Sequence, residues 1–230
     1  MISLLPVEGI GEVGSGDEIA DLVLDHAALE ERDVLVVTQK IVSKAEGRLV
    51  PLDASDLRAR RRLVLSESAR VLRDREGLII SETRHGFVCA NAGVDLSNVA
   101  VGQAALLPVD PDRSARHIRD ALRARTGLTL GVIISDTFGR AWRNGLTDVA
   151  IGCAGVAAVV DLRGTPDANG KELAVTEMCV ADEIAAAAEL AKGKANGVPA
   201  VIVRGLEPSL FRESSVRAEI VRPHQMDLFR

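Results

Sequence analysis

The chain has almost no aromatic side chains: its 230 residues include no Tyr, four Phe and one Trp. Proteins that bind single-stranded nucleic acid stack bases on several aromatic rings, so this class is disfavoured. A formal net charge of −5 also disfavours binding to a phosphate backbone. One basic cluster exists, at Arg58, Arg60, Arg61 and Arg62, and we interpret it as the solvated face of a helix. We therefore expect no nucleic-acid partner.

Cysteines and long apolar runs are also scarce. Cys89, Cys153 and Cys179 are odd in number and far apart, and no Cys-x-x-Cys pair occurs, which excludes a disulfide framework and a thiolate zinc site. No stretch approaches the ~20 apolar residues of a membrane span. The N-terminus lacks the basic start and apolar core of a signal peptide. These absences predict a reduced, cytoplasmic protein without a membrane partner.

The residues that are present predict a mixed fold. Hydrophobic residues make up 47% of the chain, which is enough for a substantial core. We expect one unit, residues 1–230, with two lobes and a candidate lobe boundary at 164–171. Strands and helices mix without strict βαβ alternation, which indicates an α+β fold of mixed sheets flanked by helices. Apolar runs predict strands at 2–7, 34–37, 132–134, 156–162 and 198–203. Periodic or Ala-rich segments predict helices at 17–29, 56–74, 112–125 and 177–192, the last capped by Thr176.

Two apolar runs lead into polar segments. The strand predicted at 132–134 stops at Ser135 and is expected to open into a polar loop that ends near Asp148. A second run, 78–80, leads into a Gly-containing polar segment that reaches Asn98. A buried strand that delivers a carboxylate at its C-terminal end is the usual geometry of a metal or phosphate site in an α/β protein. Together, the two segments predict one composite site.

Asp95 and Asp136 are the strongest candidates for metal ligands. With the Thr137 hydroxyl and phosphate oxygens, these two carboxylates would form the hard oxygen shell that Mg²⁺ or Mn²⁺ prefers. For Asp95 a second interpretation stays open, because an Asp that follows Gly93-Val94 is also typical of a turn.

The glycine-rich N-terminal loop resembles a nucleotide-binding motif only in part. Residues 9–14 match the Gly-x-Gly-x-x-Gly fingerprint, but Gly14 continues into more loop, and the next strand does not end in an acidic residue. The loop could contact a nucleotide through its backbone or form an ordinary turn. No P-loop is present. Lys40 and Lys44 follow a buried strand and are candidates for phosphate contacts, with a solvated helix face as the alternative.

Three long segments resemble one family. Residues 36–48, 85–98 and 135–145 are closely similar to the coenzyme F420-0:L-glutamate ligases, the CofE family, which also forms the N-terminal half of the two-domain FbiB proteins. Residues 107–112 and 180–185 agree too, so the resemblance covers essentially the whole chain. The tail, residues 226–230, leaves no room for the fused nitroreductase-like half of FbiB, and we expect a single CofE-like unit.

The resemblance implies an activity. The family is GTP-dependent, requires Mn²⁺ or Mg²⁺, often with K⁺, and forms homodimers. It joins L-glutamate to a carboxylate of coenzyme F420-0 and adds further glutamates through γ-links. We expect the carboxylate to be activated as an acyl phosphate, with release of GDP and then phosphate. Two alternatives stay open: a related metal-dependent acid–amine ligase with another acceptor, and a non-catalytic protein that binds GTP or the deazaflavin.

The resemblance also implies site residues. Asp95 and Asp136 would hold one metal ion and Thr137 a second. Independently of the resemblance, Arg140, Arg143 or Arg84 could stabilise the transferred phosphoryl group or the incoming carboxylates, because a planar guanidinium suits both. Lys194 stands in a region where some members place a Gln metal ligand, and a charged lysine cannot ligate a metal. The residues implied to touch GTP are Ile10, Gly11, Glu12, Val13, Gln39, Lys44 and Asn98.

Overall fold

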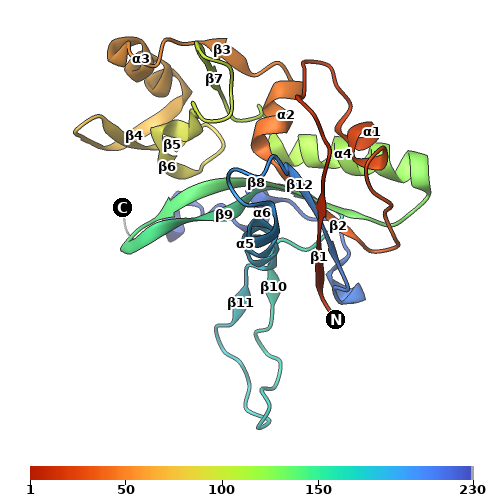
Figure 1. Cartoon of the computed structure of the whole chain (residues 1–230). Coiled ribbons are helices and arrows are strands. Elements are labelled where there is room, and N and C mark those ends of the chain that lie inside the picture. Colours follow the sequence, from red (N-terminus) through yellow and green to blue (C-terminus); the bar gives the residue numbers. More distant parts are fainter. Residues whose placement is uncertain (229–230) are drawn as a thin grey trace.

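A five-stranded mixed sheet forms the centre of the molecule (Figure 1). The computed structural model describes residues 1–228. Only β2 and β8 run parallel, and the other neighbouring strands are antiparallel. The predicted α+β class is therefore confirmed. Across the sheet the strands are β1 (Ser3–Val7), β12 (Ala200–Arg204), β2 (Val34–Thr38), β8 (Gly131–Arg140) and β9 (Arg143–Ala154).

Helices cover both faces of this sheet, because its central strands are apolar on both faces. Leu35 and Val37 pack into one core, whereas Val34 and Val36 pack into the other, as expected for successive residues of a strand. The first core is closed by α1 (Ile19–Leu24), α2 (Gln39–Ala45) and α4 (Pro111–Thr126). The second is closed by α5 (Val180–Lys192) and α6 (Val216–Glu219).

Helix α4 shows how local sequence sets the ends of an element. The side chain of Asp110 accepts a hydrogen bond from the backbone N–H of Arg113 at 2.9 Å, and Pro111 occupies the first turn. Gly127 ends the helix with a φ of 75°, a conformation that costs glycine little. The helix predicted at 112–125 is confirmed within two residues at its ends.

A second group of elements lies beside the sheet, at the upper left of Figure 1, and has its own small core. The helix predicted over 56–74 is wrong in its second half, because α3 ends at Glu67 and the chain continues as a strand. Antiparallel pairing with the next strand outweighs the helix propensity of these residues. The elements are β3 (Leu49–Pro51), α3 (Leu57–Glu67), β4 (Ser68–Arg75), β5 (Leu78–Thr83), β6 (Val88–Ala90) and β7 (Gln103–Ala105), with a 3-10 turn at Asn91–Gly93.

The segment that follows Ser135 is a β-hairpin, so the predicted polar loop is wrong. Strand β8 continues to Arg140 and pairs with β9 from Val132 to its end, with Thr137 opposite Asp148. The polar residues lie on a hairpin whose outer part is exposed, and an exposed hairpin tolerates the same composition as a loop. A register shift between Ile134 and Ser135 marks the point where the strand leaves the core.

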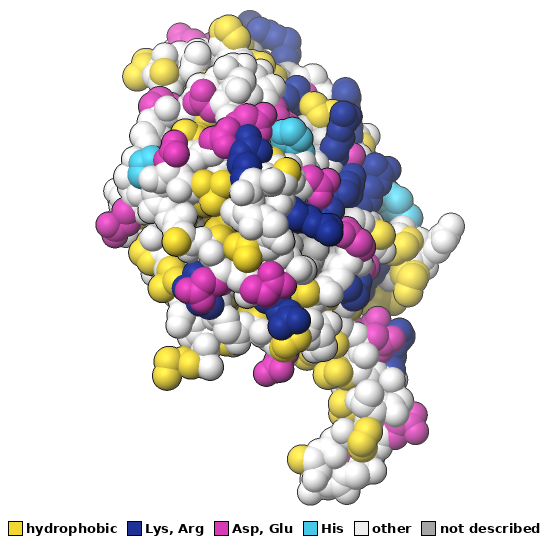
Figure 2. Space-filling view, turned by 90° about the vertical axis from the view of Figure 1, so that its right-hand side faces the viewer, with side chains coloured by type: hydrophobic (Ala, Val, Ile, Leu, Met, Phe, Trp, Pro, Cys, Tyr) yellow, Lys and Arg dark blue, Asp and Glu magenta, His cyan; other side chains and the backbone are white. Residues whose placement is uncertain are grey.

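A second hairpin, residues 160–178, projects from the body as an arm (Figures 1 and 2). Its paired strands are only β10 (Val160–Asp161) and β11 (Glu177–Met178), so the strand predicted at 156–162 is largely wrong. The helix predicted from Glu177 begins instead at Val180, preceded by Cys179 rather than by the predicted Thr176 cap. The stretch 164–171 forms the end of the arm and does not connect two lobes.

The remaining elements are short. Helix α1 covers less than the predicted 17–29, and the strand predicted at 198–203 is β12, shifted by one to two residues. Two 3-10 turns, Pro208–Leu210 and His224–Met226, flank α6. None of the helices within residues 1–228 combines the length and the apolar character needed to cross a bilayer.

Gly152 of β9 is required by the close approach of α4. A Cβ at this position would lie 2.3 Å from the carbonyl oxygen of Pro111 and 2.8 Å from the backbone nitrogen of Asp112, and backbone atoms cannot yield as a side chain can. We expect Gly152→Ala to destabilise the protein by about 1–3 kcal/mol, the usual cost of overpacking. In the matched control Gly139→Ala, the nearest atom would be 3.8 Å away. Urea unfolding of both variants tests this, and equal stabilities would contradict it.

Candidate functional site

The parallel pairing of β2 and β8 ends at Thr38 and Ser135. The residues that follow, which begin α2 after Thr38 and continue β8 after Ser135, are therefore neighbours. A cavity of about 1080 Å³ opens there, which is at the upper end of the volume of small-molecule sites. All of the predicted site residues line this cavity except Arg84, Arg140 and Arg143. The structure thus brings together segments near residues 10, 40, 95, 136 and 194.

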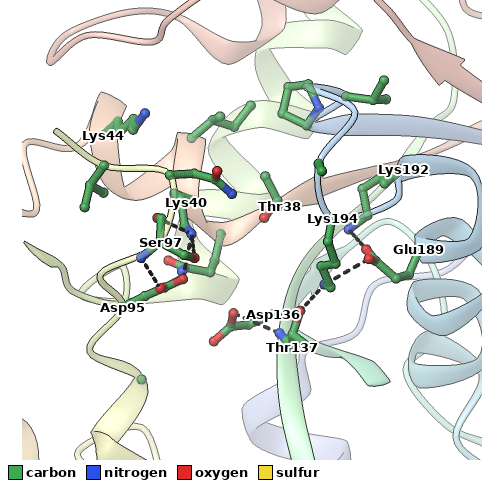
Figure 3. Close-up of a pocket in the computed structure, with 18 of the residues that line it drawn as sticks. Thr38, Lys40, Lys44, Asp95, Ser97, Asp136, Thr137, Glu189, Lys192 and Lys194 are labelled. Atoms are coloured by element: carbon green, nitrogen blue, oxygen red, sulfur yellow. Dashed lines mark hydrogen bonds and ion pairs between the residues drawn. The ribbon is translucent and has the colours of Figure 1, made fainter. Parts of the chain in front are cut away.

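Asp136 lies in the middle of this cavity (Figure 3). Its carboxylate accepts a hydrogen bond from the backbone N–H of Thr137 at 2.8 Å. Burial raises the pKa of Asp136 to about 7, and the nearby carboxylates of Asp95 and Asp148 add to the effect. Among residues 1–228, no lysine or arginine forms an ion pair with it. A cation bound beside Asp136 would therefore stabilise the ionised form of its carboxylate.

Asp95 faces the same space from the other side. Its Oδ2 lies 2.6 Å from Lys40 Nζ, and its Oδ1 accepts a hydrogen bond from the backbone N–H of Ser97 at 2.7 Å. Burial acts to raise the pKa of Asp95, but the bonds from Lys40 and Ser97 outweigh it and leave the pKa below its ordinary value. The bond to Ser97 is that of an Asp turn, so both interpretations of Asp95 hold: it shapes the turn and it lines the cavity.

The chemistry of this pair fits one divalent cation. Asp95 and Asp136 offer oxygen ligands, which hard cations prefer. A cation between them would offset the burial that mainly raises the pKa of Asp136 and the smaller effect of repulsion from Asp95. Within the described residues, no three His, Cys, Asp or Glu side chains gather as a metal site. Two protein carboxylates suit an ion that takes its other ligands from phosphate and water.

A second cluster of charges lines the opposite wall (Figure 3). Buried Lys192, at the end of α5, lies 2.7 Å from Asp148 Oδ2 and 3.3 Å from Glu189 Oε2. Lys194 Nζ lies 3.1 Å from Asp148 Oδ1 and 2.9 Å from Glu189 Oε1, and it also donates to the hydroxyl of Thr137. Each carboxylate therefore bridges both ammonium groups, and the Thr137 hydroxyl is already engaged.

The predicted nucleotide contacts lie along the first wall. Lys44 is buried on α2, with its Nζ 2.5 Å from Glu12 Oε1, so the glycine-rich loop is tied to the helix. Gln39 is also buried, and its Oε1 accepts a hydrogen bond from the Ser43 hydroxyl at 2.8 Å. The solvated-face alternative for Lys44 is excluded by its 7% exposure. Ile10, Gly11, Val13 and Asn98 complete the part of the lining that was predicted.

Arg140 and Arg143 lie elsewhere. They lie opposite each other on neighbouring strands at the exposed end of the β8–β9 hairpin. Neither is among the residues that line the cavity. Their predicted role in stabilising a phosphoryl group has no support from this arrangement. The reason is the length of β8, which carries these side chains away from Asp136 instead of folding them back over it.

Sequence reasoning missed the charges on α5. Glu189 and Lys192 lie in an Ala-rich helix and resemble ordinary surface residues in the sequence, yet both line the cavity. Asp182, in the first turn of the same helix, accepts a hydrogen bond from the backbone N–H of Ala150 at 2.8 Å and anchors the helix to β9. Cys89 also lines the cavity, but it is buried, and burial raises the pKa of its thiol to about 12, so it stays protonated at neutral pH.

Comparison with known proteins places the chain among the ligases. A family model described as F420-0:gamma-glutamyl ligase matches residues 9–205. The chain belongs to this family, which confirms the resemblance seen in the sequence.

Relatives match over nearly their full lengths. The Coenzyme F420:L-glutamate ligase of Methanothermobacter thermautotrophicus is 44% identical over 100% of this chain and 99% of its own length. The protein of the same name from Methanopyrus kandleri is 44% identical over 98% of this chain and 96% of its own length. The protein of the same name from Methanocaldococcus jannaschii is 36% identical over 94% of this chain and 92% of its own length.

Proposed function

We propose that the protein is a GTP-dependent ligase that adds L-glutamate to coenzyme F420-0, and then adds further glutamates through γ-links. Family membership supports the glutamate ligase activity. The observation that carries the proposal is the cavity itself, which sets Asp136, a carboxylate without an ion-pair partner among residues 1–228, between walls that present Lys40, Lys44 and Lys194. Such an arrangement suits a polyphosphate that arrives with a divalent cation.

The reaction must first activate a carboxylate, because amide formation from a free carboxylate is uphill. The acceptor carboxylate attacks the γ-phosphorus of GTP, and GDP leaves with the electron pair of the broken P–O bond. A divalent cation on Asp95 and Asp136 would supply charge neutralisation at the phosphates. Lys44, held by Glu12 on one wall, is positioned to bind phosphate oxygens as a fixed point charge.

The amine of glutamate then attacks the acyl phosphate. The new C–N bond forms as phosphate leaves, and the amine loses a proton. The cavity volume of about 1080 Å³ leaves space for a second substrate beside the nucleotide. A potassium requirement, a homodimer and a cytoplasmic location remain predictions from the sequence.

An isotope experiment tests the acyl phosphate. Coenzyme F420-0 with ¹⁸O in its acceptor carboxylate is incubated with the protein, GTP, Mn²⁺ and L-glutamate, and the released phosphate is analysed by mass spectrometry. We expect one ¹⁸O atom in each phosphate released with the first glutamate, because the carboxylate oxygen stays on phosphorus when the amide forms. Phosphate from later additions comes from the unlabelled γ-carboxylate of the glutamate just added. Addition of the first glutamate with unlabelled phosphate would rule out this intermediate. The same reaction with ATP in place of GTP tests the nucleotide.

The pKa of Asp136 predicts how cation binding depends on pH. Only the ionised carboxylate binds the cation, so the affinity for Mn²⁺ should rise with pH up to about 7 and then level off. We expect a dissociation constant about tenfold weaker at pH 6 than at pH 8, because one proton must be displaced. Isothermal titration calorimetry in two buffers of different ionisation enthalpy measures both the affinity and the proton released. An affinity for Mn²⁺ that is constant from pH 6 to pH 8 would contradict the assignment of Asp136 as a ligand of the cation.

A further inference from the structure

The wall formed by α5 contains a cation of its own. The Lys194 ammonium contacts three oxygen-bearing side chains: the Thr137 hydroxyl, Asp148 and Glu189. These are the oxygens that a metal ion beside Thr137 would need. Figure 3 shows the ammonium between Thr137 and Glu189, across the cavity from Asp95.

The charges of this cluster are balanced without a metal ion. Asp148 and Glu189 carry two negative charges, and Lys192 and Lys194 carry two positive charges. The two oxygens of each carboxylate are divided between the two lysines, which closes a ring of four ion pairs. A divalent ion added here would face two ammonium groups at close range, and it would have to displace Lys194 to reach Thr137.

The cluster around Asp136 is different. Asp136 lines the same cavity as the Asp95 carboxylate, and no ion pair to Asp136 is found within residues 1–228. Asp95 and Asp136 together have one ion-paired lysine, Lys40 on Asp95, whereas Asp148 and Glu189 have two, Lys192 and Lys194. The first pair of carboxylates therefore leaves a negative charge for an added cation to balance, and the second pair does not. A second metal ion, which the family resemblance implies at Thr137, does not fit the residues present here.

We propose that the Lys194 ammonium takes the place of the second divalent cation, so that each active site binds one divalent ion, at Asp95 and Asp136. This inference rests on the proposed metal-dependent reaction. In this chain the phosphates would meet one divalent ion on one side and a covalently attached cation on the other. The site at Asp95 and Asp136 alone would then determine which divalent metal supports the reaction.

The number of bound Mn²⁺ ions tests the proposal without turnover. Mn²⁺ is counted by equilibrium dialysis and metal analysis, with and without the non-hydrolysable analogue β,γ-imido-GTP. We expect one ion per chain in the original protein. In Lys194→Gln the charge is lost and an amide oxygen is offered beside Thr137, Asp148 and Glu189, so we expect two ions per chain. Lys171→Gln, on the exposed end of the arm, is the matched control and should bind one.

Every outcome of this count decides the question. Two ions in the original protein would show that Lys194 yields to a metal, and the proposal would be wrong. One ion in both the original protein and Lys194→Gln would show that these oxygens are not a cation site at all. No bound ion would overturn the assignment of Asp95 and Asp136 as well. If the original protein binds one ion and Lys194→Gln binds two, but the original protein has no ligase activity, only the proposed function is rejected.

Discussion

Asp136→Asn is expected to lower kcat/KM for ligation by at least ~10³-fold, since a metal ion at developing charge contributes several kcal/mol and each 1.4 kcal/mol is a factor of ten. The amide keeps the shape of the side chain and one oxygen, but it removes the charge that would hold the cation between Asp95 and Asp136. Steady-state phosphate release at saturating Mn²⁺ measures the effect. Activity within tenfold of the original protein would contradict the metal role.

The same substitution should stabilise the metal-free protein. The pKa of Asp136 is about 7 when folded and 3.8 in the reference state, so its protonated form favours the folded protein. This contribution is complete below about pH 3.8 and is lost as the pH rises through about 7, and at pH 8 ionisation costs at most ~4 kcal/mol. Asp136→Asn avoids this cost, so its thermal midpoint without metal should exceed that of the original protein at pH 8. Exposed Asp25→Asn is the control, with no change expected.

Asp148→Asn is expected to destabilise the protein by about 3–5 kcal/mol, the usual cost of removing one partner of a buried ion pair. Lys192 is 3% exposed and would keep a buried charge whose partner, 2% exposed Asp148, had become neutral. Urea unfolding at pH 7 measures the loss. The double variant Asp148→Asn/Lys192→Met should recover part of it, because no unpaired charge is left.

The pH dependence gives this prediction a second test. Burial acts to raise the pKa of Asp148, but Lys192, Thr137 and Lys194 outweigh it and hold the pKa well below its ordinary value. The carboxylate therefore stabilises the folded protein above about pH 3.8, and this contribution is lost as the pH falls below that value. The difference between Asp148→Asn and the original protein should shrink in acid. A difference that stays constant down to pH 3 would show that charge is not its cause.

The parts of the fold that follow from local patterns could be read from the sequence. The run Val34–Thr38 is apolar at every position up to Val37, and it is a central strand with a core on each face. Asp110, Pro111 and Gly127 mark the ends of α4 through backbone chemistry alone. The predictions fail where the secondary structure of a segment depends on the strand that pairs with it. Residues 68–75 become strand β4 because β5 is beside them, a fact that the segment itself does not contain.

The site divides in the same way. Asp136 could be found because it directly follows the buried apolar run of β8, at the point where side chains emerge from the core. Lys192 and Glu189 could not, because their role comes from the packing of α5 against the β8–β9 hairpin, which is a long-range contact. The sequence predicts Arg140 and Arg143 in the site because the segment after Ser135 has the composition of a loop. The pairing of β8 with β9 instead carries both residues to the far end of a hairpin.

The most direct test of the central claim is the mass of the product. The protein is incubated with coenzyme F420-0, L-glutamate, Mn²⁺ and GTP, and the deazaflavin is analysed by mass spectrometry. We expect a gain of one or more glutamyl units that requires both GTP and glutamate and that is absent with Asp136→Asn. An unchanged deazaflavin mass, under conditions in which the protein binds GTP and Mn²⁺, would contradict the proposed ligase activity on this acceptor.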